Sequence, residues 1–203
     1  MILLGLTGGI AAGKSFVGRM IARRGIPVID ADVLAREAVR PGEEGFFEVA
    51  RVFPQAVKDG AIDRPALGRI VFGDPEKRAA LEAIVHPRVR AAFLREKERL
   101  GALPLVVYEV PLLFERGIDR EMDRTLVVDV PESLQLSRLL SRPHMTEEDA
   151  RRRIESQIER QERVSRADFI ISGSLSEEET EGELARILGE ILGHAPPALP
   201  DNR

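Results

Sequence analysis

The sequence predicts an α/β fold in which a five-stranded parallel sheet is flanked by helices. Five short runs rich in apolar and β-branched residues recur along the chain, at residues 2–7, 27–30, 105–109, 125–130 and 168–171. Longer segments with helical periodicity separate these runs, and such alternation is typical of βαβ units. Polar residues or glycine follow each run. Because ligands of such sheets bind beyond the carboxyl ends of the strands, we expect the functional site at that edge.

Two helical insertions are expected within this sheet. Residues 41–103 contain no convincing strand and read as four helices, at 44–52, 64–71, 75–85 and 87–100, separated by Pro and Gly residues. The predicted domains are therefore a core of residues 1–40 and 104–203 and a helical substrate-binding insertion of residues 41–103.

A small lid is expected within about residues 141–166. It contains a helix that starts at Thr146 with a capping-box-like pattern and carries five arginines: Arg151, Arg152, Arg153, Arg160 and Arg163. An amphipathic helix at 177–192 and a frayed tail at 195–203 complete the chain.

Composition excludes several classes of protein. The chain has 203 residues, 43% of them hydrophobic, which is enough for a sizeable core. A net charge of −4 gives no footprint for nucleic acid, and the absence of cysteine excludes disulfides and thiolate chemistry. The opening apolar run is too short to span a membrane and lacks the basic flank of a signal peptide. We expect a cytoplasmic protein, without nucleic-acid or membrane partners, that is a monomer or a weak homo-oligomer.

The most informative motif occupies residues 8–15, Gly-Gly-Ile-Ala-Ala-Gly-Lys-Ser, which fits the pattern G-x-x-x-x-G-K-[ST]. Its backbone N–H groups would cradle phosphates, while the glycines allow close approach. Lys14 would contact the β- and γ-phosphates and Ser15 would ligate Mg²⁺. A helix that begins near Lys14 would add its positive dipole end. The motif predicts a nucleotide site formed by this loop, with these residues at the phosphates: Gly8, Gly9, Ala11, Ala12, Gly13, Lys14 and Ser15.

Two aspartates, Asp30 and Asp32, follow the second predicted strand. A carboxylate there can accept a proton from an attacking hydroxyl or orient it. The alternative is that Asp32 only caps a helix over residues 33–39. Capping alone does not account for two acids at this place, so the catalytic interpretation is preferred for Asp32. Asp30 is equally consistent with either role.

Two acids end apolar runs and are candidates to support Mg²⁺. Glu109 ends the run at 105–109, and Asp129 ends a run of the same form. Sequence leaves both candidates open, and we favour Glu109. Arg142 lies in the loop before the arginine-rich helix, where a guanidinium can clamp transferring phosphate. The other arginines of that segment are more simply interpreted as a solvated helix face.

These residues together resemble the dephospho-CoA kinase family. The resemblance covers residues 3–173 and depends on the phosphate loop and on the order of several short segments: Ile29-Asp30-Ala31-Asp32, His86-Pro87, Pro111-Leu112-Leu113-Phe114-Glu115 and Ala167-Asp168. It implies a P-loop kinase core with a helical substrate lobe and a lid. The implied reaction is Mg²⁺-dependent transfer of the ATP γ-phosphoryl group to the ribose 3′-hydroxyl of dephospho-CoA.

The resemblance also implies site residues. Ala11 through Phe16 would lie at the ATP phosphates, Asp32 would be the base, and Arg142 would belong to the lid. His86, Leu112 and Leu113 would contact the acceptor, and Ser172 and Gly173 would lie near adenine. Three positions depart from the family pattern: Phe16 replaces a second Ser or Thr, Glu109 stands where Asp is common, and Ser172-Gly173 replaces an Asn-containing turn.

Other functions are less consistent with the sequence. A GTP-dependent switch needs an N-K-x-D segment, and the only asparagine is Asn202. A nucleotide-binding assembly subunit would need a partner surface that sequence does not reveal. Within kinases, the alternative is a nucleoside or nucleoside-monophosphate kinase, which shares the core and the lid.

Overall fold

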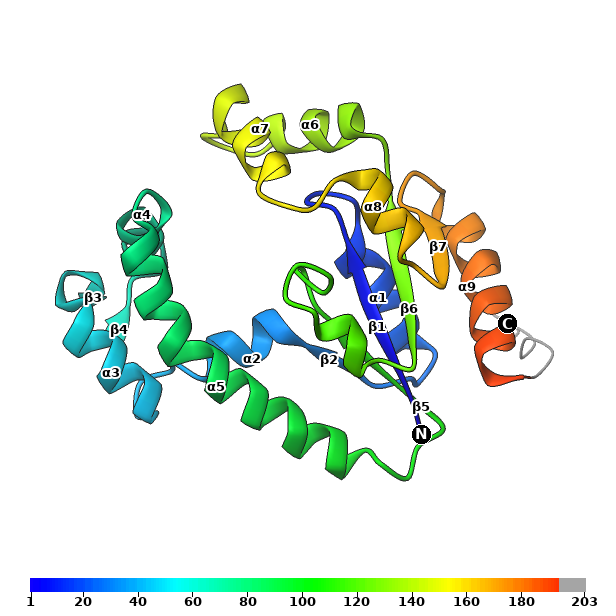
Figure 1. Ribbon diagram of the computed structural model, residues 1–203, viewed down its shortest axis with the longest axis horizontal. Coiled ribbons are helices and arrows are strands. Elements are labelled where there is room, and N and C mark those ends of the chain that lie inside the picture. The colour runs from blue at the N-terminus through cyan, green and yellow to red at the C-terminus, as the bar shows by residue number, and fades with distance from the viewer. Residues whose placement is uncertain (194–203) are drawn as a thin grey trace. The chain divides into compact units, whose positions relative to one another are not determined.

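The computed structural model describes residues 1–193, and the chain divides into two compact units (Figure 1). Within the described residues, one unit comprises residues 1–28 and 101–193, and the other comprises Ile29–Leu100. The sequence placed the helical insertion at residues 41–103, whereas the compact unit already starts at Ile29. The difference is helix α2 (Ala31–Glu37), which packs on α5 (Pro75–Arg99) and so belongs with the helices that follow it.

The five-stranded sheet has the order β2-β5-β1-β6-β7. Its strands are β1 (Ile2–Gly8), β2 (Val28–Asp30), β5 (Leu105–Glu109), β6 (Arg124–Asp129) and β7 (Phe169–Ser172). The central strand β1 pairs in parallel with β5 on one side and β6 on the other, and β6 pairs in parallel with β7. The predicted α/β class with a five-stranded sheet is confirmed.

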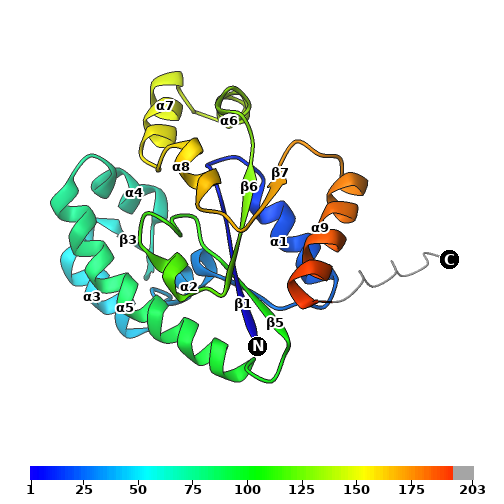
Figure 2. The same cartoon turned by 45° about the vertical axis from the view of Figure 1, so that its right-hand side comes forward.

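Hydrophobic burial explains why these strands form. All five residues of β5 are buried, as expected for a parallel strand covered on both faces. Helices α1 (Lys14–Arg23) and α9 (Glu177–Leu192) pack against each other beside the sheet (Figure 2). Leu4 of β1, Val128 of β6 and Ile187 of α9 are fully buried in one core cluster. The predicted helix at 177–192 is confirmed, and it begins with a capping box in which Ser176 and Glu179 satisfy each other's backbone N–H groups.

Three helices and a 3₁₀ turn complete this unit: α6 (Glu132–Leu140), α7 (Glu147–Glu155), α8 (Arg160–Ser165) and the turn Ile118–Glu121. Thr146 caps α7 as expected. The sequence predicted one helix that carries all five arginines. This prediction is wrong, because a linker separates α7 from α8. Ile158 of that linker donates its N–H to Glu115 and accepts from Arg163, so its peptide groups are used in tertiary contacts instead of helical ones.

The second unit contains α2, α3 (Glu44–Val52), the turn Pro54–Ala56, α4 (Arg64–Phe72) and α5. The expectation that it lacks strands is wrong. A short antiparallel hairpin joins β3 (Val57–Lys58) to β4 (Ala61–Ile62). Asp59 and Gly60 at its tip have φ of 50° and 75°, as a two-residue primed turn requires.

The two helices expected at 75–85 and 87–100 form one continuous helix, α5, with Pro87 in its interior. Pro87 lacks an N–H and disfavours a helix, which is why the sequence suggested a break. The Arg88 guanidinium donates to the carbonyl of Ile84 (2.8 Å), one turn earlier, and pairs with Glu48 of α3. Packing of α5 on α2, α3 and α4 outweighs the local cost of the proline.

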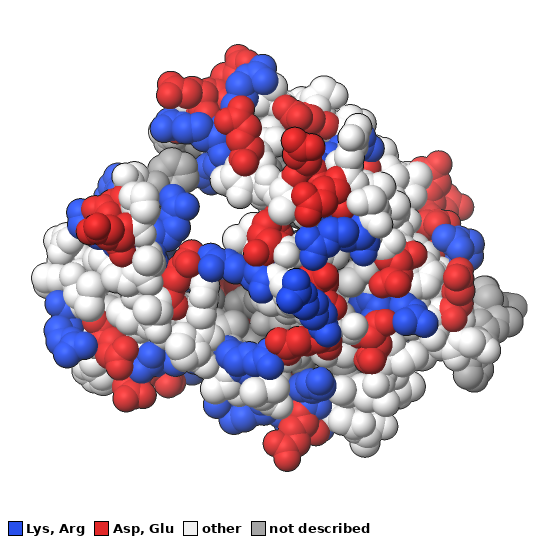
Figure 3. All heavy atoms as spheres, in the orientation of Figure 1, with Lys and Arg blue, Asp and Glu red and all other residues white. Residues whose placement is uncertain are grey.

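Surface charge is mixed in sign. On the face shown in Figure 3, Lys and Arg side chains are interspersed with Asp and Glu. Within residues 1–193, none of the helices is both long and apolar enough to cross a membrane. The expected frayed tail at 195–203 lies outside the described residues.

Candidate active site

The loop between β1 and α1 has the backbone form of an anion nest. Gly13 adopts φ of 105° at the N-terminus of α1, and Ala11 is also left-handed, with φ of 60°. The Ala12 N–H donates to the Gly9 carbonyl within the loop (3.0 Å). The first N–H groups of α1 have no partner within the helix, and the helix dipole adds positive potential at the same place. This geometry suits a bound phosphate.

Close packing around the loop explains its glycines. A Cβ on Gly8 would collide with the carbonyl oxygen of Val128, and one on Gly9 would collide with the Gln135 amide. A Cβ on Gly173 would likewise collide with the carbonyl oxygen of Ala12. The turn after β7 therefore touches the phosphate loop, which brings the predicted Ser172-Gly173 segment to this site.

Lys14, Ser15 and Glu109 meet at the first turn of α1. The Lys14 Nζ lies 2.6 Å from Glu109 Oε1, and the Ser15 hydroxyl donates to the same oxygen (2.8 Å). The Lys14 and Glu109 side chains are only 12% and 5% exposed. Leu6 pairs with Glu109 in the register of β1 and β5, which brings the acid to the end of β1 that leads into the loop.

The other acid considered from sequence has a different partner. Asp129 forms a bidentate ion pair with Arg160, with Nε 3.0 Å from Oδ1 and Nη2 2.6 Å from Oδ2. This pairing raises the pKa of Arg160 through the hydrogen bond and the charge of Asp129. Of the two candidates, Glu109 contacts the predicted Mg²⁺ ligand Ser15, and Asp129 contacts an arginine of α8.

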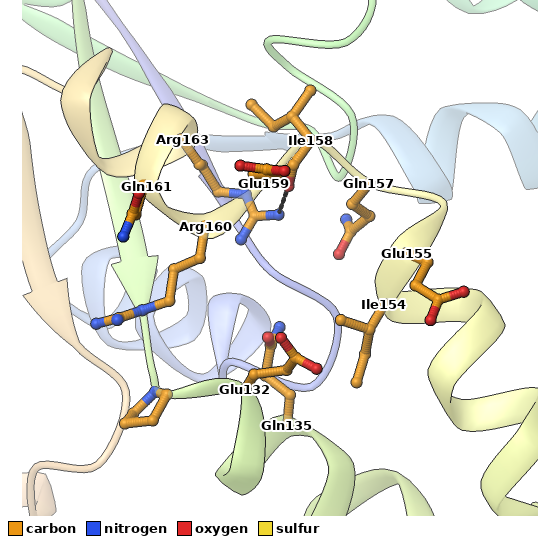
Figure 4. Close-up of a pocket in the computed structure, with 11 residues that line it drawn as sticks. Glu132, Gln135, Ile154, Glu155, Gln157, Ile158, Glu159, Arg160, Gln161 and Arg163 are labelled. Atoms are coloured by element: carbon orange, nitrogen blue, oxygen red, sulfur yellow. Dashed lines mark hydrogen bonds between the residues drawn. The ribbon is translucent and has the colours of Figure 1, made fainter.

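Four side chains that surround the phosphate loop were not assigned to it from sequence. Gln135 and Arg138 lie on one face of α6, three residues apart. Gln157 comes from the linker and Arg163 from α8, and Figure 4 shows both together with Gln135. Arg138 donates to the carbonyls of Ala11 (3.1 Å), Ala12 (3.2 Å) and Gly173 (2.8 Å). These contacts join segments more than thirty residues apart, and no local sequence signal marks them.

Arg163 corrects the expectation of a solvated arginine face. Its residue is 5% exposed, and burial lowers the pKa of its guanidinium, partly offset by the charges of Glu115 and Asp129. It lies against Gly9 and lines a cavity of about 530 Å³ next to the loop, together with Gln135 and Gln157 (Figure 4).

Several other predicted residues are placed as follows. Phe16 is in the first turn of α1 and packs its partly buried ring on the core. Arg142 is exposed in the loop after α6. Leu112 is partly exposed, whereas Leu113 is fully buried beside Gly5 and presents no side-chain surface to a ligand.

The second unit carries the acids that follow β2. Asp30 is the N-cap of α2, and its carboxylate accepts from the N–H groups of Asp32 (2.7 Å) and Val33 (3.3 Å). The alternative in which Asp32 caps this helix is therefore wrong. Asp32 instead lines a cavity of about 380 Å³ with two cations, Arg36 and Arg64, and an apolar wall from α2, β4, α4 and α5. His86 is exposed on α5, next to Val85 of that wall.

Comparison with known proteins agrees with this geometry. The model of the family "Dephospho-CoA kinase" matches residues 2–179. A dephospho-CoA kinase of Geobacillus kaustophilus is 46% identical over 191 residues, which cover 92% of this chain and 95% of the relative.

Two solved structures are similar over nearly the whole chain. A Thermus thermophilus protein has a TM-score of 0.81 at 38% identity and covers 93% of this chain and 97% of its own. Dephospho-CoA kinase from Campylobacter jejuni has a TM-score of 0.70 at 30% identity, with coverages of 94% and 97%. The family match, the sequence relative and these folds lead to one conclusion: the chain belongs to the dephospho-CoA kinase family and is a kinase.

Proposed function

We propose that this chain transfers the γ-phosphoryl group of ATP to the 3′-hydroxyl of the ribose of dephospho-CoA, with coenzyme A and ADP as products. The observation that carries the proposal is the cluster of Lys14, Ser15 and Glu109 at the first turn of α1. A cation, a hydroxyl and a carboxylate converge there beside a loop built for phosphate. The family of the chain supports the choice of acceptor.

The phosphate loop would hold the triphosphate. Backbone N–H groups of the loop and of the α1 N-terminus would bind the phosphate oxygens. Lys14, which pairs with Glu109, would contact the β- and γ-phosphates. Gly173 touches the loop, so adenine would lie near Ser172 and Gly173. Phe16 would contribute only its backbone to the nucleotide, since its ring packs on the core.

The donor set of this cluster fits Mg²⁺. Mg²⁺ takes oxygen ligands and is commonly held by one or two protein oxygens, with waters and substrate phosphates in the other positions. The Ser15 hydroxyl and Glu109 carboxylate, 2.8 Å apart, provide such oxygens, the latter directly or through water. When bound, the ion would neutralise charge on the transferring phosphoryl group.

Asp32 is the proposed base for the acceptor hydroxyl. The Asp30 carboxylate accepts from the Asp32 N–H and so fixes the backbone of Asp32 in the first turn of α2. The cavity lined by Asp32 would take the acceptor. Arg36 and Arg64 suit the diphosphate of dephospho-CoA, and the apolar wall suits its uncharged arm. His86, Leu112 and Leu113 remain proposed contacts of the acceptor, with Leu113 limited to its backbone.

Arg142 is the proposed lid residue that stabilises the transferring phosphoryl group. It is exposed in the loop between α6 and α7, where closure of a lid would bring its guanidinium onto phosphate. A closed lid would also exclude water, which would otherwise compete as acceptor. We further propose that this reaction between dissolved metabolites takes place in the cytoplasm, with the chain acting as a monomer or a weak homo-oligomer.

The decisive experiment compares acceptors. Purified protein with ATP and Mg²⁺ is given dephospho-CoA or a panel of nucleosides and nucleoside monophosphates. ADP release is measured and the products are analysed by mass spectrometry and ³¹P NMR. We expect a new 3′-phosphate on dephospho-CoA, and no product from Lys14→Ala. Turnover only with a nucleoside or nucleoside monophosphate would contradict the proposal and support the alternative kinase class.

A further inference from the structure

We propose that Gln135 and Gln157 are positioning residues that orient the phosphate loop by holding both peptide groups of Ile10. The inference rests on the proposed function to the extent that the loop is taken to bind the triphosphate. Neither glutamine would need to touch the nucleotide. Their role would be to set the direction of a backbone N–H that does.

The two contacts are short and come from glutamines on different elements, Gln135 on α6 and Gln157 after α7 (Figure 4). Gln157 Oε1 accepts from the Ile10 N–H (2.6 Å), and Gln135 Nε2 donates to the Ile10 carbonyl (2.8 Å). Gln135 is buried in α6, with 3% of its surface exposed, and Gln157 lies in the linker between α7 and α8. Two different elements therefore hold one residue of the loop.

Because a peptide group is planar, these two contacts also set the directions of the Ala11 N–H and the Gly9 carbonyl. In a planar trans peptide, the C=O and the N–H point in opposite directions. Gln135 draws the Ile10 carbonyl toward α6, so the N–H of Ala11 points to the other side, into the loop. Gln157 draws the Ile10 N–H outward, so the Gly9 carbonyl points inward, where it accepts from Ala12 (3.0 Å).

The loop needs such restraint because its conformation is strained. Ala11 has φ of 60°, a left-handed conformation that is unfavourable for a residue with a Cβ. Such a residue persists only where its surroundings hold it. The Ile10 carbonyl is held by Gln135 and the next two by Arg138. Without Gln135, the Ile10–Ala11 peptide could rotate and remove the Ala11 N–H from the phosphate site.

Gln157 is itself held at a fixed place. The next residue, Ile158, donates its N–H to Glu115 (3.1 Å) and accepts from Arg163 (2.8 Å). A neutral amide at position 157 provides an acceptor without placing a full negative charge beside the phosphates. Gln135 is likewise neutral, so it provides a buried hydrogen-bond donor without the free-energy cost of burying a charged group.

The test uses methionine, which retains most of the length of glutamine and removes its hydrogen bonds. Gln135→Met, Gln157→Met and the double variant are compared with Gln161→Met, which changes a residue of the same cavity that is exposed on α8. Affinities for the non-hydrolysable ATP analogue AMP-PNP and for adenosine are measured by calorimetry. The Ala11 amide signal is followed by NMR of protein labelled with ¹⁵N-alanine, and thermal unfolding monitors the fold.

We expect Gln135→Met to bind AMP-PNP about tenfold more weakly, since the Ala11 amide would turn away from the phosphate. Gln157→Met should weaken binding by a similar factor, because release of the Ile10 N–H lets the same residue leave its strained place in the loop. Adenosine affinity should not change, the Ala11 amide signal should shift, and the double variant should resemble either single one, because both act through Ile10. Gln161→Met should resemble the wild type.

Equal losses for AMP-PNP and adenosine, or unchanged AMP-PNP binding, would overturn the positioning role. If Gln135→Met does not fold, Gln157→Met decides the question, because its side chain is half-buried on a linker. Failure of the wild type to bind AMP-PNP would overturn the proposed function as well. Wild-type binding with unaffected variants would overturn only this inference.

Discussion

Replacing Gly18 by alanine tests how closely Glu109 must approach α1. A Cβ at position 18 would collide with Glu109 Oε2 and lie 3.2 Å from the carboxyl carbon. The Glu109 carboxylate would have to move, and it is the group that holds Lys14 and Ser15. The variant therefore perturbs the active site through a single methyl group that touches no substrate.

Opposing terms determine the size of the effect. Alanine favours a helix over glycine by about 1 kcal/mol. Overpacking in a well-packed site costs about 1–3 kcal/mol, and complete loss of a partner from a buried ion pair costs about 3–5 kcal/mol. Because Glu109 is displaced but not removed, we expect Gly18→Ala to lower the free energy of unfolding by about 1–3 kcal/mol. Misplacement of Lys14 and Ser15 should lower kcat/KM by about tenfold or more.

The matched control is Gly182→Ala. Gly182 is exposed in α9, and a Cβ there would meet nothing within 4 Å, so only the helix propensity changes. The free energy of unfolding of this variant should rise by up to about 1 kcal/mol, and its activity should be unchanged. Unfolding free energies come from urea titrations, and activity from ADP release with dephospho-CoA.

A second-site change sharpens the test. Glu109→Asp shortens the side chain by one methylene and withdraws the carboxylate from position 18. The double variant Gly18→Ala with Glu109→Asp should therefore be more stable than the sum of the two single effects predicts. Equal stability and activity of Gly18→Ala and Gly182→Ala would show that Glu109 does not need this close approach to α1.

Three further predictions concern the acceptor side and the last helix. Asp32→Asn should lower kcat by about 10²-fold with little change in the KM for ATP, in steady-state kinetics, because a general base is lost while the nucleotide site is intact. Arg36→Ala should raise the KM for dephospho-CoA with a smaller effect on kcat, because it would remove a contact to the acceptor phosphates and not to the reacting hydroxyl. Glu179→Gln should lower stability in urea titrations above about pH 4.5. Hydrogen bonds from the Ser176 N–H and hydroxyl lower the pKa of Glu179, so its contribution is present above the unfolded value of 4.5 and is lost as the pH falls through the lowered folded value.

Each of these predictions has an outcome that contradicts it. Unchanged turnover in Asp32→Asn would exclude this carboxylate as the base. An unaltered KM for dephospho-CoA in Arg36→Ala, with Arg64→Ala also unaltered, would place the acceptor elsewhere than in the cavity. A stability gap between Glu179→Gln and the wild type that is as wide at pH 3 as at pH 7 would show that charge is not its cause.

The sequence alone determined the features that depend on neighbouring residues. Apolar runs predicted the strands of the sheet, and helical periodicity predicted the helices between them. The G-x-x-x-x-G-K-S pattern predicted the phosphate loop. The start of α7 at Thr146 was readable because a cap involves residues only three apart, and α9 was readable from its amphipathic pattern. In each case, a short segment of chain contains the whole pattern.

Which distant groups meet depends on the tertiary structure. Glu109 and Asp129 end strands on opposite sides of β1, and their sequences alone do not show that the first contacts Lys14 and the second Arg160. Pro87 suggested a helix end, but packing of α5 on three other helices outweighed that local preference. Gln135 and Gln157 both form hydrogen bonds with Ile10. They are separated from it in the sequence by 125 and 147 positions, respectively. Such contacts depend on strand register and helix packing, which are properties of the whole chain and not of any local pattern.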